Sequence, residues 1–193
     1  DESVLEKALH YTKTEYIKTS PLEFNRLYGP DKIKLDDVEF YIMPIKPKYH
    51  KLLFPWADTQ PDFLAGFFPA GNAIKKAYVC HSPVKHLKPG SVLLFYRSYD
   101  EQSVRCIGVV EKTIRSDDAM TVLRFVGKRT VYDPSMIERM CRKEVFAVLF
   151  RYYGELKKPI SLNDLINEYI LKAAPETITK LGSGIKQCLL KQI

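Results

Sequence analysis

The sequence has neither the long apolar runs nor the short catalytic motifs that would assign it to a functional class directly. No stretch approaches the ~18 apolar residues of a membrane-spanning helix, and no charged-then-apolar leader precedes the first helix signals. We therefore expect a soluble, cytoplasmic protein that has no membrane partner. The chain begins at Asp1 rather than at a methionine, which is compatible with a piece of a longer protein.

Paired cysteines are also missing. The four cysteines stand far apart and without paired spacing, so we expect reduced, mostly buried thiols and no disulfide. The segment CHSPVKH, residues 80–86, carries Cys, His and Ser, but no second group of ligands matches it as a zinc site would require. The sequence contains no HExxH, no Ser-His-Asp motif and no phosphate-binding glycine loop. We expect no metal, no cofactor and no catalytic residues.

Positive charge is concentrated in one part of the chain. The whole chain has a net charge of +7, and residues 41–99 carry 8 Lys or Arg against 2 Asp or Glu. Tyrosines and the single tryptophan are interleaved with these cations. Cations neutralise phosphates and aromatic rings stack on bases, so the pattern favours a nucleic-acid surface. The simpler alternative for each residue is a solvated lysine or a packed ring.

Helix and strand signals divide the chain into two parts. Residues 1–40 carry 9 Asp or Glu against 6 Lys or Arg. Residues 1–35 contain two capping boxes, which predicts a helical or extended appendage, or the tail of an upstream domain. Residues 36–193 form the predicted main domain. Its expected strands, chosen for β-branched and aromatic content, are 38–45, 73–80, 91–98, 103–114, 120–126, 128–132 and 144–153.

Helices are expected at the end of the chain, near 161–173 and 185–192, where Ser161 is a capping residue. Strands followed by terminal helices, without regular alternation, indicate an α+β fold with a curled, mostly antiparallel sheet. The strand at 91–98 should be central. The long segment between the first two strands is rich in Pro, Gly and aromatic residues, which is typical of a functional loop.

Two segments of the chain carry distinctive motifs. Pro89 and Gly90 enter a strand that ends in Tyr96-Arg97-Ser98, and an Ile-Gly-Val-Val strand follows at 107–110. The second segment is EVFAVLFRYYGELKKPISLNDL, residues 144–165. These segments resemble the PUA-like superfamily, in particular its EVE and ASCH branches, and the second is similar to the family's closing strand and helix start. The ASCH signature Gly-x-Lys-x-x-Glu-x-Arg is absent. With its lysine on Lys75, the other three positions hold Ala73, Tyr78 and Cys80.

The resemblance implies a β pseudo-barrel flanked by helices, with a cleft that binds nucleic acid, often through one extruded or modified base. We expect a non-enzymatic module that binds nucleic acid, with RNA slightly favoured over DNA. Two alternatives stay open: an accessory domain of a GNAT acetyltransferase that recruits a substrate or protein partner, and a hydrolase acting on a modified nucleoside. The residues expected to hold the phosphates and the base are Lys46, Lys48, Tyr49, Trp56, Lys75, Lys76, Tyr78, Tyr96 and Ser98, with Arg97 on the opposite face.

Overall fold

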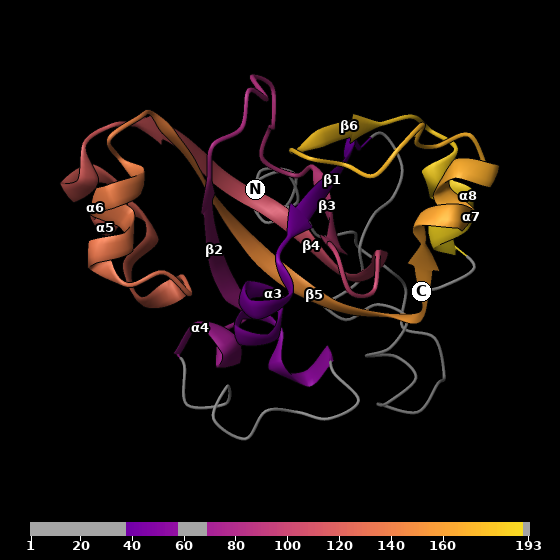
Figure 1. The fold of residues 1–193 in the computed structure, drawn as a ribbon, viewed down its shortest axis with the longest axis horizontal. Coiled ribbons are helices and arrows are strands. Elements are labelled where there is room, and N and C mark those ends of the chain that lie inside the picture. Colours follow the sequence, from indigo (N-terminus) through magenta and orange to yellow (C-terminus); the bar gives the residue numbers. More distant parts are fainter. Residues whose placement is uncertain (1–37, 58–68, 191–193) are drawn as a thin grey trace, which may run out of the picture. The chain divides into compact units, whose positions relative to one another are not determined.

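A curled, six-stranded mixed sheet forms the centre of the domain (Figure 1). The computed structural model describes residues 38–57 and 69–190. The strands follow the order β2-β5-β4-β3-β1-β6, and only β1 and β3 run parallel among the paired strands. The predicted α+β fold class is confirmed. The bounds are β1 Phe40–Ile45, β2 Lys75–Cys80, β3 Val92–Arg97, β4 Ser103–Ser116, β5 Val145–Ser161 and β6 Thr179–Leu181.

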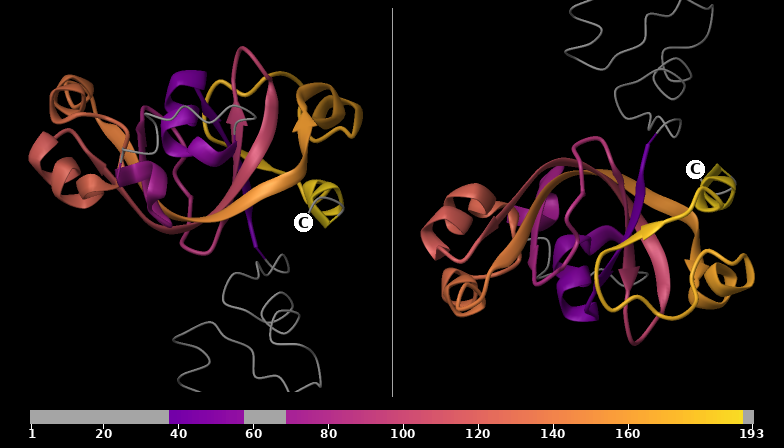
Figure 2. Two further views of the ribbon diagram at one scale, coloured as in Figure 1. Left: turned by 90° about the horizontal axis from the view of Figure 1, so that it is seen from below. Right: turned by 90° about the horizontal axis from the view of Figure 1, so that it is seen from above.

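Helices cover the sheet in three groups. Helices α5 and α6 lie at one end of the long strands β4 and β5, and α7 and α8 lie at the other side near β6 (Figure 1). Seen along the sheet, α3 lies within the curve of the strands (Figure 2). None of the helices in the described ranges has the length and hydropathy to span a bilayer. The bounds are α3 Pro47–Leu53, η1 Pro55–Ala57, α4 Pro69–Asn72, α5 Ala119–Val126, η3 Gly127–Arg129, α6 Pro134–Met140, α7 Leu162–Asn167 and α8 Ile185–Leu190.

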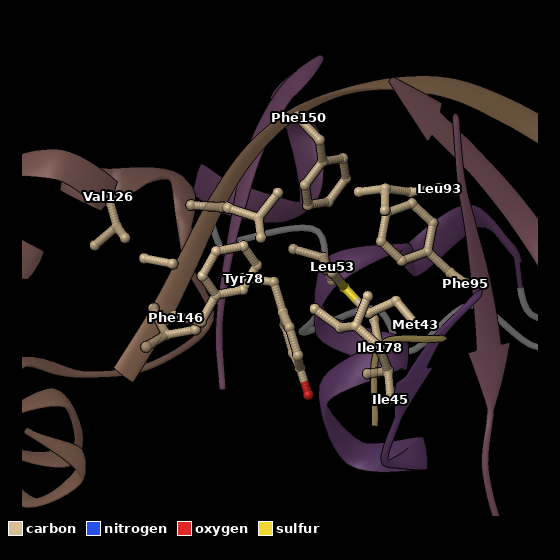
Figure 3. Close-up of a cluster of buried hydrophobic side chains, with 14 of the residues drawn as sticks. Met43, Ile45, Leu53, Tyr78, Leu93, Phe95, Val126, Phe146, Phe150 and Ile178 are labelled. Atoms are coloured by element: carbon tan, nitrogen blue, oxygen red, sulfur yellow. The ribbon is translucent and has the colours of Figure 1, made fainter. Parts of the chain in front are cut away.

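Strand β3 is buried along its whole length, because it lies between β4 and β1 and is covered on both faces. Its side chains alternate between two apolar regions. Leu93 and Phe95 belong to the main cluster, where they pack with Leu53 and Phe150 (Figure 3). Leu94 and Tyr96 are equally buried but lie outside that cluster. The strand expected at 91–98 is thus central, as predicted.

The second apolar region lies on the other face of β1, β3 and β4. Strand registers place Ile42 beside Leu94, and Leu94 beside Ile107. Leu165 of α7 and Ile185 of α8 are fully buried outside the main cluster. The C-terminal helices therefore also bury apolar side chains apart from the main cluster.

Two predicted strands are wrong. Residues 120–126 form helix α5 and residues 128–132 contain no strand. Asp118 caps α5, since its side chain accepts hydrogen bonds from the backbone N–H groups of Met120 and Thr121. Val122 and Val126, four residues apart, are the buried residues of this helix. The cap and the helical spacing outweigh the β propensity of the valines.

The terminal helices begin where expected but differ in length. Ser161 and Asp164 form the predicted cap as a complete capping box, yet α7 ends at Asn167 rather than near 173. The predicted helix 185–192 corresponds to α8, and its last two expected residues, 191 and 192, lie outside the described residues. The appendage over 1–35, the boundary at 36 and the helices predicted there also lie outside them and stay predictions.

Candidate functional site

The carboxyl ends of β1 and β3 meet because these two strands are parallel and in register, with Ile45 beside Arg97. The backbone N–H of Ser98 donates to the carbonyl of Ile45 at 3.0 Å. Four of the predicted site residues, about fifty positions apart in the sequence, therefore come from adjoining segments: Lys46, Lys48 and Tyr49 on one side and Ser98 on the other. Residues 46–49 together with 98–102 are called the β1–β3 end below.

Tyr99 is the most conspicuous side chain of the β1–β3 end. It is 72% exposed, although a tyrosine ring is large and mostly apolar. Its backbone has φ 70°, a left-handed conformation that costs a non-glycine residue about 1–2 kcal/mol. An exposed ring held in an unfavourable backbone conformation is typical of a binding surface. The sequence placed Tyr99 among the aromatic residues of the basic segment but not among the site residues; its position just after the polar end of the strand is the signal that could have found it.

Two arginines fix the turn that carries Tyr99. Arg97 is buried, and its guanidinium donates to both carboxylate oxygens of Asp100, at 3.0 and 2.6 Å. A third nitrogen of Arg97 lies 3.0 Å from Glu101. Arg105 pairs with the same Glu101 at 2.5 Å and also donates to the carbonyl of Ala57. Arg97, expected on the face opposite Tyr96 as a salt-bridge or surface residue, is thus a buried residue with two ion pairs.

This network determines the charge of the β1–β3 end. Burial is the largest single influence on Asp100 and raises its pKa, but the hydrogen bonds and charge of Arg97, together with backbone hydrogen bonds, lower the pKa overall. Asp100 and Glu101 are both neutralised from inside by Arg97 and Arg105. Lys46 and Lys48 are exposed, and neither forms an ion pair with another residue of the described ranges. Their two charges remain for a ligand.

A row of tyrosines continues from the β1–β3 end toward β2. The ammonium of Lys48 lies 6.0 Å from the centre of the Tyr49 ring, whose centroid is 4.8 Å from that of Tyr132. Tyr132 in turn lies 5.8 Å from Tyr78, seen in the core in Figure 3. Burial raises the pKa of Tyr78 to about 12, so its hydroxyl is neutral. Tyr49 is half-buried, whereas Tyr78 is a core ring.

Tyr96 does not line a cleft, and this part of the predicted site is wrong. It is 1% exposed, and burial raises its pKa. Its register partners are Val104 on β4 and Pro44 on β1, and it lies outside the main cluster. The alternation of side chains along β3 correctly placed Tyr96 and Arg97 on opposite faces. The face that holds Tyr96 is a second apolar core rather than a cleft.

The hydroxyl of Tyr96 has no hydrogen-bond partner among the described residues. An unsatisfied buried hydroxyl costs about 1–3 kcal/mol. We therefore expect Tyr96→Phe to leave the free energy of unfolding unchanged or raise it by about 1 kcal/mol, measured by urea denaturation. Tyr41→Phe is the control, because the Tyr41 hydroxyl donates to the carbonyl of His86 at 2.8 Å and its loss should be destabilising. A clear loss of stability in Tyr96→Phe would contradict the orphaned hydroxyl.

Lys76 is also not a surface cation. It is 1% exposed, and its Nζ donates to the carbonyl oxygens of Ala70 and Gly71, at 2.6 and 2.8 Å. The rings of Phe54 and Tyr152 lie 5.8 and 5.5 Å from Nζ. Burial lowers the pKa of Lys76 to about 8. Along β2 its side chain points inward, so the prediction that it holds a phosphate is wrong.

The remaining predicted residues lie elsewhere. Lys75 is on β2, which β5 and β4 separate from β3 in the sheet, and it pairs with Glu111 at 3.1 Å. Trp56 belongs to η1, and its side chain is outside what the structure describes. Within residues 38–57 and 69–190, no three His, Cys, Asp or Glu side chains gather as metal ligands would.

The curled mixed sheet, the parallel pair at its centre and the flanking helices define the class as a PUA-like fold. Within it, the chain is similar to the ASCH protein of Zymomonas mobilis, with 16% identity and a TM-score of 0.55 over 79% of this chain and 94% of that chain. A serine-to-alanine mutant of the same protein, ZmASCH, aligns with 15% identity and a TM-score of 0.61 over 80% and 96% of the two chains. At such low sequence identity, these structural alignments show a shared fold.

Human THYN1, in a structure with 5-methylcytosine-containing DNA, aligns with 15% identity over 79% of this chain and 96% of that chain. Its TM-score of 0.44 is too low to carry an argument. No family model matches the sequence. No curated protein matches it significantly.

Proposed function

We propose that this PUA-like domain is a non-enzymatic nucleic-acid-binding module, with RNA as its ligand, and that the β1–β3 end contacts the strand. The observation that carries the proposal is the exposed ring of Tyr99, held in a left-handed backbone at the same β1–β3 end as Lys46 and Lys48, which form no ion pair within the described residues. Rings stack on unpaired bases while lysines neutralise the flanking phosphates. The internal pairing of Asp100 and Glu101 removes the repulsion that these carboxylates would otherwise exert on a phosphate.

The hydrolase alternative would need an accessible catalytic group. Lys76 has a pKa near the range that suits a general base, but its side chain is enclosed and its nitrogen is engaged by two carbonyls. The ASCH signature places a carboxylate three residues after its lysine. That position holds Tyr78 if the lysine is Lys75, and Val79 if the lysine is Lys76. The environment of Lys76 therefore favours a structural role, and binding is the better-supported function.

Binding to single-stranded RNA should weaken steeply with salt, with a log-log slope of about −0.7 for each phosphate neutralised. The double variant Lys46→Ala, Lys48→Ala should flatten the slope by about 0.7 to 1.4, because two counterion-releasing contacts are lost. Fluorescence anisotropy over a series of salt concentrations measures the slope of each protein. Lys143→Ala, an exposed lysine after α6 at the other end of β4 and β5, is the control and should keep the slope. Affinity that does not respond to salt would contradict the proposal, as would no binding to RNA or DNA at low salt.

Tyr99→Ala should weaken RNA binding by about 1–3 kcal/mol, the usual contribution of one stacked base, which is roughly a 5- to 150-fold loss. Tyr169→Ala is a closely matched control: Tyr169 is 96% exposed and also left-handed, with φ 55°, but follows α7. Both changes should leave the melting temperature nearly the same, because neither ring is packed. Equal effects of the two substitutions on affinity would show that the ring of Tyr99 has no special part in binding.

A further inference from the structure

Strand β5 contains extra residues near the turn that carries Tyr99. In the pairing of β4 with β5, the two residues of β4 on either side of Arg105 have partners that lie five positions apart, Glu155 and Ile160. Arg105 alone therefore faces four residues of β5, 156–159, where regular pairing requires one. In Figure 1 the ribbon of β5 bends sharply before the arrowhead that leads into α7. Residues 156–159 are called the β5 bulge below.

The β5 bulge presents two adjacent lysines to solvent. Leu156 within it and Ile160 just after it are buried and fix its two ends. Lys157, Lys158 and Pro159 between them are all exposed. Proline has no N–H to donate to a strand ladder, so it suits a position that has no register partner. Bulges are common next to binding sites, where they redirect side chains.

The sheet places the β5 bulge at the same edge as the β1–β3 end. The backbone N–H of Leu162 donates to the carbonyl of Gln102 at 2.8 Å, which ties the end of β5 to the turn that carries Tyr99. Lys158 stands four positions before Leu162, and an extended chain covers at most about 14 Å over that separation. The strand order β5-β4-β3-β1 puts this turn between the β5 bulge and the end of β1. Tyr99 therefore lies between two groups of lysines.

The charges of the β5 bulge are available to a ligand. Lys157 and Lys158 form no ion pair with another residue of the part of the chain that the structure describes. On the facing turn, the carboxylate of Glu101 is already paired with Arg97 and Arg105. Two ammonium groups on neighbouring residues repel each other, and an anion bound between them relieves that repulsion.

We propose that Lys157 and Lys158 bind backbone phosphates of the strand whose base stacks on Tyr99, an inference that rests on the proposed function. The bound strand then runs along one edge of the sheet, from Lys46 and Lys48 across Tyr99 to the β5 bulge. Phosphate contacts of this kind position a strand without selecting its bases. The ligand is therefore a single strand of any sequence that is long enough to reach both groups of lysines.

The test measures the salt dependence of binding to a uracil strand of about twelve nucleotides, within the usual range for a single-domain site. Lys157→Ala, Lys158→Ala should flatten the log-log slope by about 0.7 to 1.4, because up to two phosphate contacts are lost. Joined to Lys46→Ala, Lys48→Ala, the two changes in slope should add, since the two pairs contact different phosphates. Lys157→Arg, Lys158→Arg keeps both charges and should keep the slope. Fluorescence anisotropy measures all four proteins.

The matched control is Arg142→Ala, Lys143→Ala. These cations are also adjacent, exposed and without an ion pair to any described residue, and they follow α6 at the other end of β4 and β5. Their removal lowers the net charge by the same two units and should keep the slope. Equal flattening by this control would overturn the inference, because net charge rather than position would then determine the slope.

The other outcomes separate this inference from the function on which it rests. An unchanged slope in Lys157→Ala, Lys158→Ala, together with a flatter slope in Lys46→Ala, Lys48→Ala, would overturn the contact at the β5 bulge and leave nucleic-acid binding standing. Failure of the intact protein to bind any strand at low salt would overturn both proposals. Melting temperatures of the variants should stay within a few degrees of the intact protein, because the substituted side chains are exposed, and they establish that the slopes come from folded protein.

Discussion

Gly108→Val should unfold the domain or lower its free energy of unfolding by about 3 kcal/mol or more, because the sheet has no room for a side chain there. A Cβ at Gly108 would lie 2.9 Å from the carbonyl oxygen of Arg151, 2.9 Å from Phe150 and 3.1 Å from Phe95. The first of these is backbone of the paired strand β5 and cannot turn aside. Gly108→Ala should cost about 1–3 kcal/mol.

Gly154→Ala on β5 is the control for this substitution. A Cβ there meets no atom within 4 Å, and the backbone is not left-handed. This change should be neutral or stabilise by up to about 1 kcal/mol, since alanine restricts the unfolded chain. Urea denaturation of the three variants, with equal m-values, measures the difference. Normal stability of Gly108→Val would mean that β4 and β5 are not as closely paired as the contacts at Gly108 indicate.

The sequence was informative about Gly108 because glycine in an apolar strand has few explanations. A glycine within a strand marks either a bend or a site where another backbone approaches closely, and the contacts with Arg151 and Phe150 show close approach at Gly108. Local sequence patterns also predicted β3 and the capping box of α7 correctly, because burial pattern and cap chemistry are local properties. Helix α5 was predicted as a strand because its valines were weighed by propensity while Asp118 was not weighed as a cap.

The candidate site was only partly predictable, for a reason of geometry. Lys46, Lys48 and Ser98 meet because β1 and β3 are parallel, which the sequence does not specify. Tyr96 and Lys76 were assigned to the site from residue type and alternation alone. Alternation gives the side of a strand but not what covers that side. In both cases the side chain is covered by protein: Tyr96 is 1% exposed, and Lys76 donates to the carbonyls of α4.

The hydrogen bonds of Lys76 also explain what stabilises α4. Ala70 and Gly71 belong to a helix of four residues whose last carbonyls have few backbone partners. Lys76 donates to both, and its stem is covered by Phe54 and Tyr152. Deprotonation leaves an amine with two N–H donors, which is enough for these two carbonyls. Titration of Lys76 should therefore change the stability of the fold without dissolving this contact.

Lys76 should make the free energy of unfolding rise with pH between about 8, its folded pKa, and 10.5, its ordinary value. In this window the unfolded chain binds the proton more tightly than the folded protein, so stability increases as the proton is lost. The full contribution is on the order of 3 kcal/mol. Half-buried Cys80 and buried Tyr78, whose pKa values desolvation raises to about 12, act in the opposite direction, because they ionise more readily when unfolded.

The contribution of Lys76 to the pH dependence of stability is obtained by comparing the intact protein with Lys76→Met. The ionisable thiols and phenols contribute to the free energy of unfolding of both proteins. The intact protein should gain on the order of 3 kcal/mol relative to the variant from pH 8 to 10.5. Lys75→Met, at the neighbouring exposed lysine, is the control and should show no such gain, because its ammonium is solvated in both states. Urea denaturation at several pH values measures the difference. A constant difference across the window would mean that Lys76 keeps an ordinary pKa, and hence that solvent reaches its ammonium in the folded protein.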